Sequence, residues 1–139
     1  MLEDMMILSF DDYEVQSRKL AGALEIPCHM IQVHRFPDGE NKLTLPGRLP
    51  EHVVICRSLD NPNEKLLELL LAAKTACELG AKVLTLVAPY LCYMRQDKAF
   101  LEGEAVSQSI VGKFLADLFD NVITVDPHLH RIQYLRQAI

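Results

Sequence analysis

The sequence predicts one α/β domain: an open, mainly parallel sheet, covered by helices on both faces, with one antiparallel β-hairpin. Short apolar runs alternate along the chain with longer segments of helical periodicity, a pattern that favours parallel strands joined by helical crossovers. Half of the residues are hydrophobic but only 6% are aromatic, and such an aliphatic composition is typical of strands buried on both faces. A chain of 139 residues is long enough to bury one such core.

The first strand is predicted at residues 5–10, a short apolar run that ends at two aspartates. A helix is expected from Tyr13 to about Leu24, because its apolar residues recur near one face. Pro27 cannot continue a helix and ends it.

Two extended runs follow, at residues 30–35 and 42–45. The dipeptide Asp38-Gly39 lies between them, and Asp-Gly between two extended runs indicates a tight hairpin turn. Residues 53–56 are then predicted to form another buried strand.

A helix is expected from about Glu64 to Leu79, after the turn and cap residues Asn61 and Pro62. Gly80 is suited to the positive-φ position that ends such a helix. The helix is apolar on several faces, which predicts burial against more than one layer or contact with another subunit.

The remaining elements repeat the alternation of strand and helix. Residues 83–88 and 122–125 are predicted strands, and residues 104–118 form a helix by their apolar spacing. A final helix is expected at residues 130–139.

Composition excludes several classes of protein. The net charge is -5, with no cluster of Lys and Arg to bind nucleic acid. No apolar run approaches the roughly 20 residues that span a bilayer, and the first residues lack the basic region of a signal peptide. We therefore expect a cytosolic protein with no nucleic-acid or membrane partner. The four cysteines are widely spaced, which favours reduced, buried thiols over a zinc site: Cys28, Cys56, Cys77 and Cys92.

The carboxyl ends of parallel strands are where ligands gather, and residues 57–58, 90–98 and 126–130 all follow strands directly. In the second of these segments, Arg95 supplies a guanidinium fork suited to phosphate oxygens, and Gln96 offers a donor and an acceptor. Asp97 would orient Arg95 or accept from a ligand hydroxyl. The alternative interpretation is a solvated loop with one surface ion pair.

Asp126 and His128 are separated by Pro127, which favours extended backbone and lets both side chains point to the same side. A carboxylate and a neutral imidazole can hold a divalent cation beside phosphate. Alternatively, Asp126 caps the last helix and His128 packs beneath it. His130 adds a rival hypothesis, a metal-dependent hydrolase using Asp126, His128 and His130, but such enzymes need further ligands downstream and none follows.

The hairpin tip at Phe36–Glu40 combines an aromatic ring with carboxylates around Gly39. Functionally, the ring of Phe36 would stack on a planar base while a carboxylate accepts from the amino group of that base. The alternative is ordinary turn chemistry. A hairpin that projects from its domain can also reach the site of a neighbouring subunit.

Taken together, these segments resemble the ribose-phosphate pyrophosphokinases, also called phosphoribosyl pyrophosphate synthetases. Five segments match in order and at compatible spacing: Arg35–Glu40; Ser58 with Pro62-Asn63 and Glu68–Leu70; Pro89-Tyr90 with Tyr93–Lys98; Glu104–Ser107; and Thr124–His128. The family's usual Asp-Leu-His is Asp126-Pro-His128 here. The resemblance covers nearly the whole chain and corresponds to the amino-terminal domain of the family.

The resemblance implies a phosphoribosyltransferase-like fold and an enzyme that moves the β,γ-diphosphoryl group of ATP onto the C1 hydroxyl of ribose 5-phosphate, with Mg²⁺. It implies a homo-oligomer in which the hairpin reaches a neighbouring subunit. By match, Asp126 and His128 would hold the magnesium ion. The residues implied to bind ATP are Phe36, Asp38, Gly39, Glu40, Arg95, Gln96, Asp97 and Lys98.

The acidic, glycine-rich ribose 5-phosphate loop of the family does not occur in these 139 residues. We therefore expect residues 1–139 to be the ATP-binding and oligomerisation domain of a two-domain synthetase. The ribose 5-phosphate domain and the catalytic residues are absent from this chain, so it would be inactive alone. The alternative is a non-enzymatic nucleotide-binding regulatory subunit that joins a full-length synthetase through its leucine-rich helix.

Overall fold

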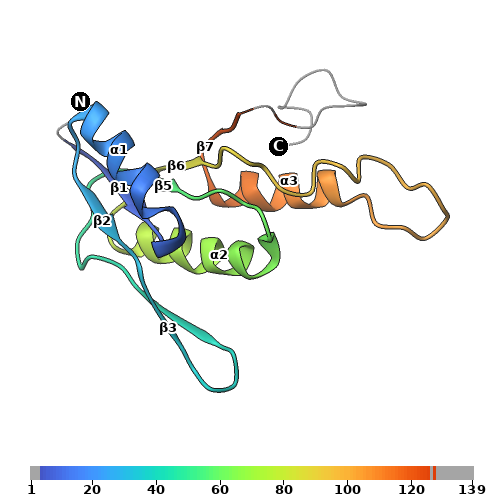
Figure 1. The fold of residues 1–139 in the computed structure, drawn as a ribbon, viewed down its shortest axis with the longest axis horizontal. Coiled ribbons are helices and arrows are strands. Elements are labelled where there is room, and N and C mark those ends of the chain that lie inside the picture. The colour runs from blue at the N-terminus through green and yellow to red at the C-terminus, as the bar shows by residue number, and fades with distance from the viewer. Residues whose placement is uncertain (1–3, 126, 128–139) are drawn as a thin grey trace.

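The computed structural model describes residues 4–125 and 127, which form a five-stranded parallel sheet with flanking helices and a projecting hairpin (Figure 1). Across the sheet, each strand pairs in parallel with its neighbour. The strands lie in the order β2 (Cys28–Met30), β1 (Met5–Ser9), β5 (His52–Cys56), β6 (Val83–Val87) and β7 (Asn121–Ile123). The predicted open parallel sheet is confirmed.

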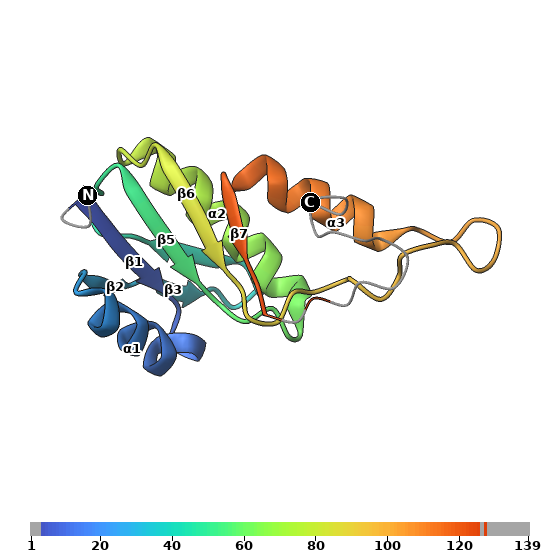
Figure 2. The same cartoon turned by 90° about the horizontal axis from the view of Figure 1, so that it is seen from above.

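Helices cover both faces of this sheet (Figure 2). A 3-10 turn, η2 (Asp11–Tyr13), leads into α1 (Glu14–Leu24) on one face, whereas α2 (Pro62–Glu78) and α3 (Ser107–Leu118) lie on the other. Alternate strand residues serve the two faces, as the strand period of two requires. One core cluster joins Leu8, Val53 and Ile55 to the α2 and α3 side. The other joins Ile7 and Val54 to α1.

The predicted hairpin is confirmed as a separate two-stranded antiparallel sheet, β3 (Gln32–Arg35) and β4 (Asn41–Thr44). At its tip the amide of Phe36 donates to the carbonyl of Glu40 at 2.8 Å, and Gly39 has a φ of +94°. The single strand predicted at 30–35 is wrong, because Met30 ends β2 in the large sheet before β3 begins. Between them, the buried Ile31 donates its amide to Ser9 at 2.8 Å.

The helix predicted at 104–118 begins three residues later than expected, at Ser107. The carboxylate of Glu104 accepts from the amides of Phe100 and Leu101, at 2.8 Å and 2.6 Å, and so closes a loop. The helix predicted from Glu64 begins earlier, with Pro62 in its first turn. The final helix predicted at 130–139 lies outside the described residues.

The leucine-rich helix α2 buries one face and exposes another. Leu69 is fully buried in the core, while Leu67 is 57% exposed. Together with α3, the exposed side of α2 forms an apolar groove of about 310 Å³, lined by Leu66, Leu67, Leu70, Ile110, Val111 and Phe114. Within the described part of the chain, no helix is both long and apolar enough to cross a membrane.

The four cysteines are free thiols. Cys56 and Cys92 are buried as predicted, and burial raises the pKa of each to about 11. Cys28 is partly buried, and burial also raises its pKa. The prediction of a buried thiol is wrong for Cys77, which is exposed on α2 because it follows the buried Ala76 around the helix.

Arg57, directly after β5, forms a buried ion cluster that joins three elements. Its Nε lies 3.2 Å from both carboxylate oxygens of Asp12, and its Nη1 lies 3.2 Å from Oε1 of Glu68 on α2. The guanidinium also stacks 3.9 Å above the ring of Phe10. Arg57 and Glu68 are only 6% and 5% exposed. Removing either side chain would therefore leave the charge of the other buried without its partner, at a large cost in stability.

We predict that Arg57→Met lowers the free energy of unfolding by about 3–5 kcal/mol, because it leaves the Glu68 carboxylate buried without its cation. The double variant Arg57→Met/Glu68→Leu should recover a large part of this loss, measured by urea denaturation. Arg18→Met is the control. It removes an exposed arginine that pairs with Glu14, and should cost no more than about 1 kcal/mol. A double variant no more stable than Arg57→Met would contradict the prediction.

Candidate functional site

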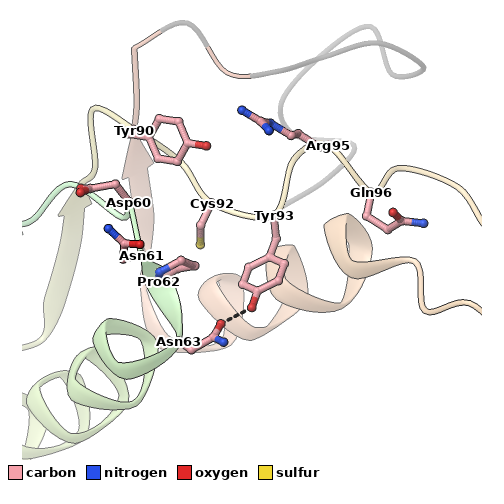
Figure 3. Close-up of a pocket in the computed structure, with 9 residues that line it drawn as sticks. All are labelled: Asp60, Asn61, Pro62, Asn63, Tyr90, Cys92, Tyr93, Arg95 and Gln96. Atoms are coloured by element: carbon pink, nitrogen blue, oxygen red, sulfur yellow. Dashed lines mark hydrogen bonds between the residues drawn. The ribbon is translucent and has the colours of Figure 1, made fainter.

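A pocket of about 500 Å³ lies at the carboxyl ends of β5 and β6 (Figure 3). One wall is the turn after β5 together with the first residues of α2, and the other is the loop after β6. The lining residues are Asp60, Asn61, Pro62, Asn63, Tyr90, Cys92, Tyr93, Arg95 and Gln96. The location is the one expected for a ligand site in a parallel sheet.

A hydrogen bond joins the two walls of the pocket. The hydroxyl of Tyr93 and Oδ1 of Asn63 are the partners, and Figure 3 shows the Tyr93 ring directed down to the start of α2. Tyr93 has a φ of +60° and Asn61 a φ of +49°. Left-handed backbone costs a non-glycine residue about 1–3 kcal/mol and persists only where the surrounding structure imposes it. Each wall of the pocket therefore includes one residue, Tyr93 or Asn61, that the surrounding structure holds in left-handed backbone.

Arg95 and Gln96 are the two sequence-predicted residues that the structure places in this pocket. Among the described residues, the Arg95 side chain is exposed and extends back toward Tyr90 (Figure 3). The Gln96 amide donates to the carbonyl of Lys98 at 2.8 Å. Asp97 and Lys98 continue the same loop, and the Lys98 ammonium lies 4.9 Å from the centre of the Phe100 ring.

Lys65 supports the wall of the pocket that follows β5. Its ammonium group donates to the carbonyl of Ser58 at 2.9 Å and to Asp60 at 3.1 Å, and it lies 3.6 Å from Asp12. The hydrogen bond from Lys65 lowers the pKa of Asp60. The wall is thus tied to the same charged cluster as Arg57.

Sequence reasoning did not identify the partners of Arg57 and Lys65. One signal was available. Glu68 stands in a leucine-rich segment on the face that α2 buries, and a carboxylate in that position requires a cation. Arg57, directly after an apolar strand, was a candidate for that cation. Asp12, 45 residues away along the chain, carried no such signal.

The structure does not bring the hairpin tip to the pocket. Residues 36–40 project in one direction and the loop that carries residues 95–105 projects in another (Figure 1). The hairpin is fixed to α2 next to its tip, where Oε1 of Glu64 accepts from Arg35 and, at 3.1 Å, from Asn41. At the tip, Phe36 is 38% exposed and packs edge-on against His34, with ring centres 5.0 Å apart.

The side chain of Asp38 accepts from the amide of Glu40 at 3.1 Å, an Asx-type turn contact that explains the local shape of the tip. This bond occupies only one carboxylate oxygen of Asp38, so the other oxygen can still accept from a ligand. The role of Asp38 in the turn is therefore compatible with the proposed role in binding.

The predicted metal ligands Asp126 and His128, and the rival ligand His130, lie outside the described residues. Among residues 4–125 and 127, no three His, Cys, Asp or Glu side chains are grouped closely enough to hold a metal ion. The described chain does lead toward the pocket. Past β7, the hydroxyl of Thr124 and the amide of Val125 each lie 3.2 Å from the carbonyl of Pro89.

Comparison with known proteins agrees with this architecture. Residues 5–122 match the family described as the N-terminal domain of ribose phosphate pyrophosphokinase. The ribose-phosphate pyrophosphokinase of Saccharolobus solfataricus is 39% identical over 112 residues, which are 78% of this chain and 38% of that protein. The Methanopyrus kandleri enzyme of the same name is 34% identical over 125 residues, which are 89% of this chain and 43% of that protein.

The crystal structure of phosphoribosylpyrophosphate synthetase from Mycobacterium smegmatis superposes with a TM-score of 0.80 at 23% identity, over 96% of this chain and 46% of that one. The predicted phosphoribosyltransferase-like fold is confirmed. This chain spans about two fifths of the length of the curated relatives that it matches. It belongs to the family of ribose-phosphate pyrophosphokinase N-terminal domains.

Proposed function

We propose that this chain is the ATP-binding part of an enzyme of nucleotide biosynthesis in the cytosol. The enzyme transfers the β,γ-diphosphoryl group of Mg-ATP to the C1 hydroxyl of ribose 5-phosphate, giving phosphoribosyl pyrophosphate and AMP. The observation that carries the proposal is the placement of Arg95 and Gln96 in a pocket at the carboxyl ends of β5 and β6. The names of the relatives supply the reaction.

The residues of the pocket suit the chemistry of such a transfer. Phosphoryl-type transfer requires in-line positioning and neutralisation of charge more than a covalent nucleophile. The Arg95 guanidinium would bind phosphate oxygens through its planar fork, and Lys98 would add a second positive charge. Cys92, the thiol in the pocket, has a pKa raised to about 11, so it is not ionised at neutral pH.

The remaining proposed nucleotide contacts come from two segments. Gln96 and Asp97 lie in the loop after β6, and Gly39 lies in the hairpin tip. Gln96 keeps its amide oxygen for a donor on the ligand, since its nitrogen donates to Lys98. Phe36 would stack on the adenine ring while Asp38 or Glu40 accepts from the amino group of adenine.

Magnesium is proposed at Asp126 and His128. A carboxylate and an imidazole are suitable donors for a divalent cation that also binds phosphate. The described contacts of Thr124 and Val125 with Pro89 bring the chain beside Tyr90 immediately before Asp126, which supports the fit. Such an ion would neutralise negative charge on the phosphate, alongside the proposed contact from Arg95.

Ribose 5-phosphate would bind to the part of the relatives that this chain does not span. The 139 residues alone are then expected to bind ATP without turning it over. Ribose 5-phosphate-dependent release of AMP by this chain in isolation would contradict that expectation.

A second candidate function is a non-enzymatic, nucleotide-binding subunit that joins a full-length synthetase. The observation that favours it is the apolar groove between α2 and α3, where Leu67 and Ile110 are 57% and 60% exposed. Titration with a Mg-ATP analogue, alone and with a full-length synthetase, separates the two. Binding that appears only in the mixture, with no added AMP release, favours the regulatory subunit.

We predict that Arg95→Ala weakens binding of a non-hydrolysable Mg-ATP analogue by roughly tenfold to a hundredfold, because a charge-assisted contact to phosphate is lost. Isothermal titration calorimetry measures the change. Arg48→Ala is the control, since Arg48 is exposed in the loop before β5, at the opposite end of the sheet from the pocket. Equal affinities of the two variants would contradict the assignment of Arg95.

We also predict that the hairpin serves the pocket of a neighbouring subunit. Phe36→Ala and Arg95→Ala should each abolish most of the binding alone. When the two are co-expressed in a symmetric dimer, about a quarter of the sites should combine an intact hairpin with an intact pocket. Calorimetry of the mixture measures this recovery. A mixture that binds no better than either variant would show that the hairpin does not act across a subunit boundary.

A further inference from the structure

The loop that carries Arg95 is held by one side chain of α3, Gln108. Although polar, Gln108 is only 4% exposed. Its side-chain amide donates to the carbonyl of Met94 at 3.0 Å, and its backbone amide donates to the carbonyl of Gln96 at 3.0 Å. The two accepting residues are the immediate neighbours of Arg95, so both hydrogen bonds together bracket that residue.

Each of these bonds satisfies a physical requirement. Gln108 is the second residue of α3, and the first amides of a helix have no partner within the helix. The carbonyl of Gln96 supplies that partner. A buried side-chain amide must likewise be paired, and the carbonyl of Met94 accepts from it. The two bonds together fix the backbone on both sides of Arg95.

The loop needs such a fixed point, because residues 88–106 connect β6 to α3 without a helix or a strand. Long loops without secondary structure are rarely ordered except by specific contacts. Glu104 closes the outer part of the loop on Phe100 and Leu101. Gln108 is the contact that ties the inner part, at Met94 and Gln96, to the helix.

The geometry points to Gln108 as a positioning residue for nucleotide binding. By fixing the peptides on both sides of Arg95, it sets the direction in which the guanidinium of Arg95 and the amide of Gln96 face the pocket. Met94 beneath them is 1% exposed, so the backbone cannot rotate here without moving a buried side chain. This inference rests on the proposed function, in which Arg95 and Gln96 contact ATP.

The first test needs no ligand. Gln108→Met keeps the volume of the side chain and removes its donor, while the backbone bond to Gln96 stays. Gln108→Glu, nearly the same shape, lacks the donor when its carboxyl is ionised, so cleavage of this variant is measured at a pH well above the pKa of that carboxyl. We expect trypsin to cleave after Arg95 and Lys98 roughly tenfold faster in both variants. Cleavage after the exposed Arg48 is the internal reference, and Ser109→Ala is the control, since Ser109 is exposed and adjacent on α3.

The second test is calorimetry with the non-hydrolysable Mg-ATP analogue on the same 139-residue chains. Gln108→Met should bind roughly tenfold more weakly than the wild type, with a melting temperature near that of Ser109→Ala. Unchanged cleavage at Arg95 and Lys98, or an unchanged affinity, would overturn the inference. A wild-type chain that does not bind the analogue would overturn the proposed function instead, and the cleavage rates would still decide whether Gln108 holds the loop.

Discussion

The contact between the buried guanidinium of Arg57 and the carboxylates of Asp12 and Glu68 is the interaction on which the carboxyl edge of the sheet depends. It joins the turn after β1, the end of β5 and the buried face of α2. These elements lie on different sides of the sheet, and the guanidinium satisfies both carboxylates with planar, directional bonds. Lys65 extends the cluster to Ser58 and Asp60. The wall of the pocket formed by the turn after β5 and the start of α2 is consequently held in place without a ligand.

The opposite wall is fixed by hydrogen bonds instead of charges. Tyr93 adopts left-handed backbone and bonds to Asn63 across the pocket, while Gln108 holds the peptides around Arg95. Conformational strain of this kind persists only where surrounding contacts impose it. A pocket whose two walls are fixed, and joined by the bond from Tyr93 to Asn63, holds the backbone around Arg95 in place before a ligand binds. Such preorganisation is what increases affinity, because the entropy of ordering is already lost in folding.

Hydrophobic periodicity predicted the location of each strand in the described chain except around residues 28–35, and there the reason is tertiary. Ile31 is buried against the large sheet, which divides one alternating run between two sheets. Arg95 and Gln96 were found because their position directly after a strand has a local signature. Gln108 had none, since its partners lie 14 and 12 residues away and only the fold brings them together. Asp126 and His128 stay predictions, because they lie outside the described residues.

The hairpin sets the remaining constraint on the proposed site. The last pair of its ladder before the tip, Arg35 and Asn41, is fixed to the first turn of α2 through Glu64, and that same turn forms a wall of the pocket. These contacts fix the position of the hairpin relative to the start of α2. Its strand β3 is exposed along its whole length, and its tip and the loop that carries residues 95–105 project in different directions (Figure 1). Stacking of Phe36 on the adenine of ATP bound by Arg95 of another copy of the chain stays a prediction, because residues 36–40 do not line the pocket of their own chain. Assembly would then complete the nucleotide site.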